Sequence, residues 1–149
     1  MKISTRGQYG LEALIGLALK STSTPVSLKS ITSDCGLSES YILQIFLMLK
    51  KAGILTSVRG AQGGYMLSRE PSQISVRQVL EAVEGPLAPV SCIVDDCNDP
   101  CGRYKMCAAR LLWEKVKKRM DSLVDSITLA DLVENVYAVD ARENPDYSI

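Results

Sequence analysis

The spacing of apolar residues in the first third of the chain predicts three helices, two of them joined by a tight turn. Residues 4–20 suit a largely buried helix, with apolar side chains at Tyr9, Leu11, Leu14, Ile15 and Leu17. Shorter helices are expected over 28–35 and 39–52, each after a serine that suits the N-cap position. Gly36 lies between them and favours the backbone turn that ends a helix. The pair is therefore predicted to form a helix-turn-helix.

The helix over 39–52 is predicted to have one buried face and one exposed face. Apolar residues at i, i+3, i+4 and i+7 predict the buried face, formed by Ile42, Ile45, Phe46 and Leu49. The other face carries Ser40, Leu43, Gln44 and Leu47. Next, ILTSV and YMLS have the composition of short strands, and the glycines of RGAQGG permit a tight loop between them. Three helices with such a hairpin, or wing, form a winged helix-turn-helix.

A capped helix, a cysteine-rich loop and a long helix are expected in the second half. Ser75 and Gln78 have the spacing of a capping box, and Gly85 ends that helix. The long helix that follows the loop has an apolar stripe formed by Leu112, Val116, Met120, Leu123 and Ile127. Because a small domain has little core left for this stripe, we expect a dimerisation helix; packing back onto its own domain is the alternative. Thr128 is expected to cap a last short helix.

The predicted fold class is mainly α with a small β-wing. Its parts are expected to be a winged helix-turn-helix DNA-binding domain over 1–84, a cysteine-rich loop over 85–107, a dimerisation helix region over 108–134 and a flexible tail over 135–149. The length of 149 residues and the 46% of hydrophobic residues suffice for one such domain with an appendage. No apolar run approaches the roughly 18 residues of a membrane span, and the first residues lack a signal-peptide pattern. We therefore expect a cytoplasmic protein without membrane contact.

Charge is distributed unevenly along the chain. Residues 1–69 contain eight Lys and Arg against three Asp and Glu, whereas residues 70–149 contain nine against fourteen. A basic first half that also carries the predicted helix-turn-helix indicates binding to double-stranded DNA. Exposed side chains at the start of the second helix would reach base edges, and basic or hydroxyl groups of the N-terminal arm and wing would grip phosphates. The candidate DNA-binding residues are Lys2, Thr5, Arg6, Tyr9, Ser38, Ser40, Tyr41, Gln44, Lys50, Ser57, Arg59 and Gly60.

Four of the five cysteines lie in the loop segment CIVDDCNDPCGRYKMC. In a reducing compartment such clustered thiols favour metal binding or redox chemistry over structural disulfides. Thiolates suit an iron-sulfur cluster, while the gaps between the cysteines do not form the paired knuckles of a structural zinc site. Zinc and a metal-free thiol sensor using Cys97 remain alternatives, and Cys35 is expected in the core. No Cys-x2-Cys active site, cofactor loop or histidine base supports an enzyme.

Several segments together resemble a known family. They are MKISTRGQYGLEAL, SVRGAQGGYML, EGPLAPV, WEKV and DSITLADL. This set resembles the Rrf-two family of winged-helix transcription regulators, of the IscR, NsrR and CymR type, and is most similar to the iron-sulfur regulators of the IscR type. The resemblance covers about residues 1–135. It implies a homodimer, a palindromic operator and an iron-sulfur cluster, expected to be [2Fe-2S], that tunes DNA binding.

The resemblance also implies the cluster ligands, which would be Cys92, Cys101 and Cys107. Cys97 would then be a spare thiol within a longer interval than the best-known members have; as a fourth ligand it would complete a set of four thiolates. Other members complete the cluster with a histidine, absent from this chain, or with a carboxylate near residue 8, where this chain has Gln8. Cys97, an oxygen ligand and a group from the partner subunit stay open as the fourth ligand. Leu43 replaces a glutamate that helps IscR-like proteins discriminate operators.

The function predicted from the sequence is transcription regulation. We expect a repressor that senses iron-sulfur cluster status and controls genes for cluster assembly and cysteine desulfurase. Within the family, regulation of the nitric-oxide response or of cysteine metabolism is the alternative. From another class, a zinc-based or thiol-based protein of redox or metal handling would use the same cysteines.

Overall fold

The computed structural model describes residues 3–20, 23–94 and 101–143, and it leaves out the side chains of Asp34 and Cys35. The prediction that Cys35 lies in the core therefore falls outside the described side chains. The α-helices are α1 (Thr5–Lys20), α2 (Leu28–Cys35), α3 (Glu39–Lys51), α4 (Val76–Glu84), α5 (Ala108–Ser126) and α6 (Leu129–Glu143). The strands are β1 (Leu55–Val58) and β2 (Gly64–Leu67), and short 3-10 helices are η1 (Pro71–Gln73), η2 (Ser91–Ile93) and η3 (Tyr104–Met106). The predicted fold class, mainly α with a two-stranded wing, is confirmed.

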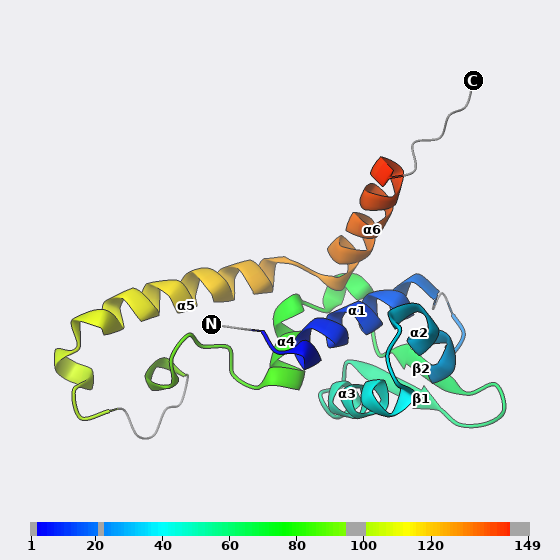
Figure 1. Ribbon diagram of the computed structural model, residues 1–149, viewed down its shortest axis with the longest axis horizontal. Coiled ribbons are helices and arrows are strands. Elements are labelled where there is room, and N and C mark those ends of the chain that lie inside the picture. Colours follow the sequence, from blue (N-terminus) through cyan, green and yellow to red (C-terminus); the bar gives the residue numbers. More distant parts are fainter. Residues whose placement is uncertain (1–2, 21–22, 95–100, 144–149) are drawn as a thin grey trace.

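The hydrophobic core lies where α1, α3 and α4 meet, beside the wing (Figure 1). The predicted buried face of α3 is confirmed, because Ile42, Ile45, Phe46 and Leu49 are at most 1% exposed. Leu14 and Leu17 of α1 are fully buried against them. Burial of these side chains supplies the main driving force for folding of the N-terminal unit.

Serine caps begin the helices at the positions that the sequence predicted. Ser27 accepts a hydrogen bond from Ser30 N, and Ser38 accepts one from Tyr41 N. Ser75 and Gln78 form a complete capping box. Gly36 has a φ of 64°, a left-handed conformation that glycine adopts without steric cost, and this sets the tight turn between α2 and α3.

The wing is an antiparallel hairpin, paired from Leu55 with Leu67 to Val58 with Gly64. An isolated bridge between Val26 and Tyr65 attaches the segment before α2 to it. The Tyr65 ring meets Phe46 edge to face, with centroids 5.0 Å apart. These contacts fix the wing to the helical core, so its position relative to α3 is set by packing.

We expect Gly64→Ala to destabilise the protein by about 1–3 kcal/mol, as overpacking does. A Cβ at Gly64 would overlap Val26 O and Val26 C, so the bridge to Tyr65 would have to open. Gly16→Ala is the matched control, because a Cβ there meets nothing within 4 Å and lies within α1. Urea unfolding of both variants measures the difference. Equal stability of the two variants would contradict the expectation.

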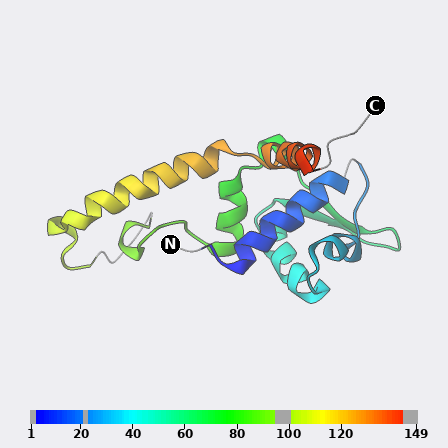
Figure 2. The same ribbon diagram turned by 45° about the horizontal axis from the view of Figure 1, so that its top comes forward.

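Helix α5 extends away from the N-terminal unit and packs against it over part of its length only (Figures 1 and 2). Met120, Val124 and Ile127 contact the apolar cluster formed by Val76, Leu80 and Leu87. Leu112 and Leu123, from the same predicted stripe, are 55% and 59% exposed. The stripe therefore divides: one part packs on its own domain, as the alternative prediction held, and the other part stays uncovered in the single chain.

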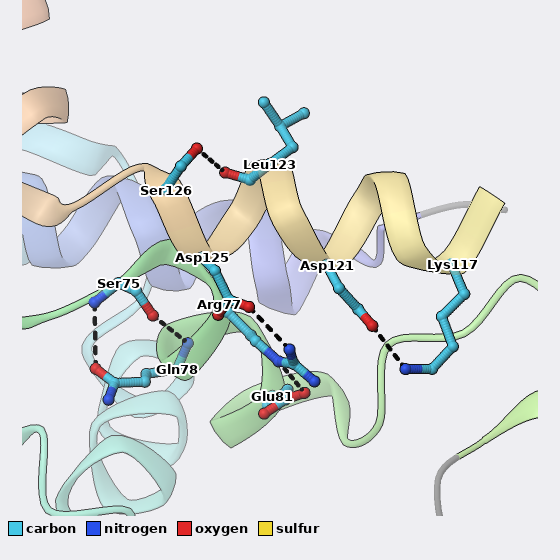
Figure 3. Close-up of polar contacts among 9 residues, drawn as sticks. All are labelled: Ser75, Arg77, Gln78, Glu81, Lys117, Asp121, Leu123, Asp125 and Ser126. Carbon is cyan, nitrogen blue, oxygen red and sulfur yellow. Dashed lines mark hydrogen bonds and ion pairs between the residues drawn. The ribbon is translucent and has the colours of Figure 1, made fainter. Parts of the chain in front are cut away.

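Ionic contacts reinforce the junction of α4 and α5 (Figure 3). Arg77 donates to Glu81 at 2.8 Å and to Asp125 at 3.0 Å. Its hydrogen bonds to Glu81 and then to Asp125 raise the pKa of the guanidinium further above its ordinary range. Because these side chains are partly exposed, each ion pair contributes no more than about 1 kcal/mol. Lys117 and Asp121 form a further pair within α5.

Helix α6 continues to Glu143, so the predicted flexible tail over 135–149 is wrong for residues 135–143. Thr128 caps the helix as predicted, and Thr128 N donates to Asp131 Oδ2 at 2.7 Å while Asp131 N donates back to Thr128 Oγ1 at 3.2 Å. The hydrogen bond from Thr128 N to Asp131 Oδ2, and then the one that the Thr128 hydroxyl donates to the same oxygen, lower the pKa of Asp131. Val136 and Val139 continue the helical spacing of apolar residues that begins at Leu129, and this favours the longer helix. Among the helices described, none is both long and apolar enough to span a bilayer.

Candidate nucleic-acid interface and cysteine loop

The exposed face of α3 presents a mixed polar and apolar surface. Ser40 and Gln44 are exposed as the sequence predicted, and Ser38 Oγ lies 3.3 Å from Ser40 Oγ. Leu43 and Leu47 are 37% and 54% exposed on the same helix. Amides and hydroxyls suit base edges in the major groove, and exposed leucines suit the methyl groups of thymine. Leu47 was not among the predicted site residues, although its place on the outer face of the helix was recognised.

Tyr9 and Tyr41 join α1 to α3. Both side chains are half-buried, and their rings meet edge to face with centroids 6.2 Å apart. Each of these two predicted DNA contacts therefore uses part of its surface for packing. The contact places the N-terminal half of α1 beside the start of α3.

The wing and the end of α3 bring further predicted residues together. Lys50 Nζ donates to Ser57 Oγ at 2.5 Å, which sets an ammonium group against strand β1. Arg59 and Gly60 are exposed at the hairpin tip, where Gly60 has a φ of 117°. A shallow groove between the wing and the N-terminus of α2 is lined by Ser27, Ser57, Arg59 and Tyr65, among others. Sequence reasoning missed Ser27 here, because the groove exists only through the pairing of Val26 with Tyr65.

The N-terminal arm reaches the end of α4. Thr5 and Arg6 are exposed in the first turn of α1, whereas Lys2 lies outside the described residues. Glu84 Oε1 accepts hydrogen bonds from Ser4 N at 3.2 Å, from Gly7 N at 2.9 Å and from Ser4 Oγ. Nothing in the local sequence signals this contact, since its partners are 80 and 77 positions apart.

The cysteine loop is described at its two ends. Cys92 lies in η2 and Cys107 at the N-cap position of α5, both half-buried, and Cys101 is exposed. Cys97 falls outside the described residues. Within the ranges that the structure describes, no three His, Cys, Asp or Glu side chains lie close enough together to hold a metal ion. The donor chemistry nevertheless fits an iron-sulfur cluster, because three thiols bracket one loop and soft thiolate ligands are those that iron-sulfur clusters use.

The turn between Cys101 and Cys107 is folded onto α5. Tyr104 N donates to Cys101 O at 2.8 Å, and the Arg110 guanidinium lies 4.7 Å from the centroid of the Tyr104 ring. Arg110 N donates to Cys107 O at 3.2 Å. The turn thus holds Cys107 at the N-terminal end of α5, with Arg110 in the first turn of the same helix.

Apolar cover for the loop comes from one end only. Ile93 is 8% exposed, and η2 packs on α5. Met106, at the other end of the loop, is 93% exposed. It follows Lys105 in the short η3 turn and has no apolar cluster of the described structure beside it.

Comparison with known proteins identifies the family that shares this sequence and fold. The family model Rrf2, described as an iron-dependent transcriptional regulator, matches residues 3–135. The HTH-type transcriptional regulator CymR of Bacillus subtilis (strain 168) is 42% identical over 132 residues, covering 89% of both chains. The solved structure of CymR, described as the global cysteine regulator of B. subtilis, has a TM-score of 0.75 at 40% identity, covering 91% of this chain and 98% of that one.

Regulators of the IscR type are similar over as much of the chain. The HTH-type transcriptional regulator IscR of Yersinia pseudotuberculosis serotype O:1b (strain IP 31758) is 35% identical over 148 residues, which is 98% of this chain and 88% of the relative. The solved structure of T. potens IscR has a TM-score of 0.73 at 42% identity, covering 91% of this chain and 88% of that one. These relatives are transcription regulators and not enzymes, as the sequence predicted. The chain, with its winged helix-turn-helix, belongs to the Rrf2 family of DNA-binding transcription regulators.

Proposed function

We propose that the protein is a homodimeric cytoplasmic repressor that binds a palindromic operator and responds to an iron-sulfur cluster, expected to be [2Fe-2S]. Cys92, Cys101 and Cys107 would hold the cluster, and genes for cluster assembly and cysteine desulfurase would be its targets. The observation that carries the proposal is the position of the three thiols, between the last helix of the winged unit and the start of α5. The family description as iron-dependent supports it.

DNA recognition would use the exposed side chains of α3, the wing and the first turn of α1. Ser40 and Gln44 would read base edges, Arg59 would enter the minor groove, and Thr5 and Arg6 would contact the phosphate backbone. When bound, the cluster would join the three cysteines and so order the loop. Loop order would act on the winged unit through the adjoining ends of α4 and α5.

The similarity to CymR, described as a global cysteine regulator, favours a second candidate, a regulator of cysteine metabolism. In this candidate the loop cysteines would hold no cluster. The two candidates differ in what the loop cysteines bind. Iron and sulfide counts on protein purified without oxygen therefore separate them.

Anaerobic purification tests the proposal directly. We expect iron, sulfide and visible absorption in the wild type, and their loss in Cys92→Ala, Cys101→Ala and Cys107→Ala, because each variant removes a thiolate ligand. Cys35→Ala is the matched control and should keep the cluster, since Cys35 lies on α2, away from the loop in the sequence. A DNA fragment selected from a random pool by the wild type should bind the iron-loaded and metal-free forms with affinities that differ by about fivefold or more.

Three results would refute the cluster. They are a wild type that contains zinc alone, a wild type that contains no metal, and equal iron contents in all four variants. The affinity for DNA should also fall steeply with salt, as phosphate contacts require.

A further inference from the structure

We infer that Glu84 is a positioning residue that ties the cysteine loop to the DNA-contacting arm. The inference rests on the proposed function, which assigns the loop to a cluster and the arm to phosphate contacts. It begins from the contact between the end of α4 and the first turn of α1, where Glu84 Oε1 accepts from Ser4 N, Ser4 Oγ and Gly7 N. A single carboxylate oxygen thus fixes Ser4 and Gly7. We call this contact the clamp, and the segment from Ser4 to Gly7 the arm.

The position of the Glu84 carboxylate is electrostatically favourable for α1 and unfavourable for α4. A negative charge at the C-terminus of a helix opposes the helix dipole, so Glu84 is unfavourable in its own helix. At the N-terminus of α1 the same charge is favourable, and α1 has no acidic residue in its first turn. Glu84 therefore supplies from α4 the N-terminal charge and hydrogen-bond acceptor that α1 lacks.

Close packing makes the contact specific. A Cβ at Gly7 would overlap Glu84 Oε1 and approach Ile3 Cγ2 to 2.9 Å. Glycine at position 7 thus allows the carboxylate to approach the backbone directly. Gly7 is buried, while the neighbouring Thr5 and Arg6 are exposed, so the clamp fixes the backbone from which these two side chains extend.

The cysteine loop begins at the next residue. Gly85, with a φ of 85°, turns the chain away from α4, and Leu87 is buried against α4 and α5. Cys92 and Ile93 follow in η2, which also contacts α5. Leu87, three residues after Glu84, is thus packed against both helices, so a rearrangement of the loop would act on the end of α4 and through Glu84 on the arm.

A double-mutant cycle tests the inference, with DNA affinity measured by fluorescence anisotropy on the selected fragment. The variants are Glu84→Ala, Arg6→Ala and the double variant, each iron-loaded and metal-free. Glu81→Gln is the matched control: it removes an acidic charge one turn earlier on α4, where the side chain pairs with Arg77. Glu84→Gln keeps an acceptor oxygen. Thermal unfolding of each variant identifies any loss of affinity that comes from loss of fold.

We expect Glu84→Ala to weaken the tighter-binding form by about fivefold or more and to bring the iron-loaded and metal-free affinities together. Arg6→Ala should then cost little in the Glu84→Ala background, because the arm is already displaced. Glu84→Gln should lie between Glu84→Ala and the wild type, and Glu81→Gln should match the wild type. Additive effects of Glu84 and Arg6, or equal effects of Glu84→Ala and Glu81→Gln, would overturn the inference. Equal affinities of the two wild-type forms would instead overturn the proposed function, so the two failures are distinct.

Discussion

Replacing Phe46 with alanine is expected to lower the free energy of unfolding by about 3–5 kcal/mol, the usual cost of removing a buried phenyl ring. Phe46 is fully buried at the meeting point of α3 and the wing, and its ring packs edge to face on Tyr65. Because a small domain is stable by only about 5–15 kcal/mol, the substitution would remove a large part of its stability. The hairpin should loosen as well, since Tyr65 loses its partner ring.

Urea unfolding followed by circular dichroism measures this effect. Leu47→Ala is the control, because Leu47 is the next residue of α3 and is 54% exposed; its substitution should change stability by no more than about 0.5 kcal/mol. Phe46→Leu should fall between the two, since it refills most of the space. Equal stability of Phe46→Ala and Leu47→Ala would show that the core is not centred on this ring.

Elements with local signals could be predicted from the sequence. The serine caps, Gly36 and the apolar spacing of α3 act within a few residues of each other, so helix limits and the buried face followed directly. The wing could be predicted for the same reason, since its two short strands adjoin a glycine-rich loop.

Contacts between distant segments could not be predicted. In the sequence, Glu84 is indistinguishable from any charged residue at the end of a helix. Only the packing of α1 across α4 shows that it binds the N-terminal arm. Arg77 and Asp125 likewise meet 48 positions apart. The length of α6 was underestimated because the polar character of ARENPDYSI, residues 141–149, was extended back to residue 135, although Val136 and Val139 keep the helical spacing. The spatial relation of the loop cysteines has no local signal either.

The proposed dimer would account for the exposed face of α5. Leu112 and Leu123 are 11 positions apart, close to three full turns, so they lie on one side of the helix. Both are more than half exposed, although the inner face of α5 already packs on α4. Two exposed leucines on one side of the helix, with the half-buried Val116 between them, are typical of a helix that pairs with a second copy.

Leu112→Asp and Leu123→Asp are therefore expected to convert the protein to a monomer and to weaken operator binding by about 100-fold or more, the gain that linked half-site binding confers. A carboxylate in a dimer interface would be desolvated without a partner, whereas in the monomer it stays in water. Sedimentation measures the oligomeric state, and anisotropy with a full palindrome and with a single half-site measures binding. The half-site affinity should not change, because neither leucine lies in the winged unit.

Lys118→Ala is the matched control. It lowers the net charge by one, as each leucine variant does, and it replaces an exposed side chain on another side of the same helix. This variant should remain dimeric and bind the palindrome like the wild type. A wild type that is monomeric at the concentrations used for binding would contradict the proposed dimer. Dimeric leucine variants with normal affinity would place the interface elsewhere, because an aspartate at the centre of a helix pair cannot be accommodated without loss of binding.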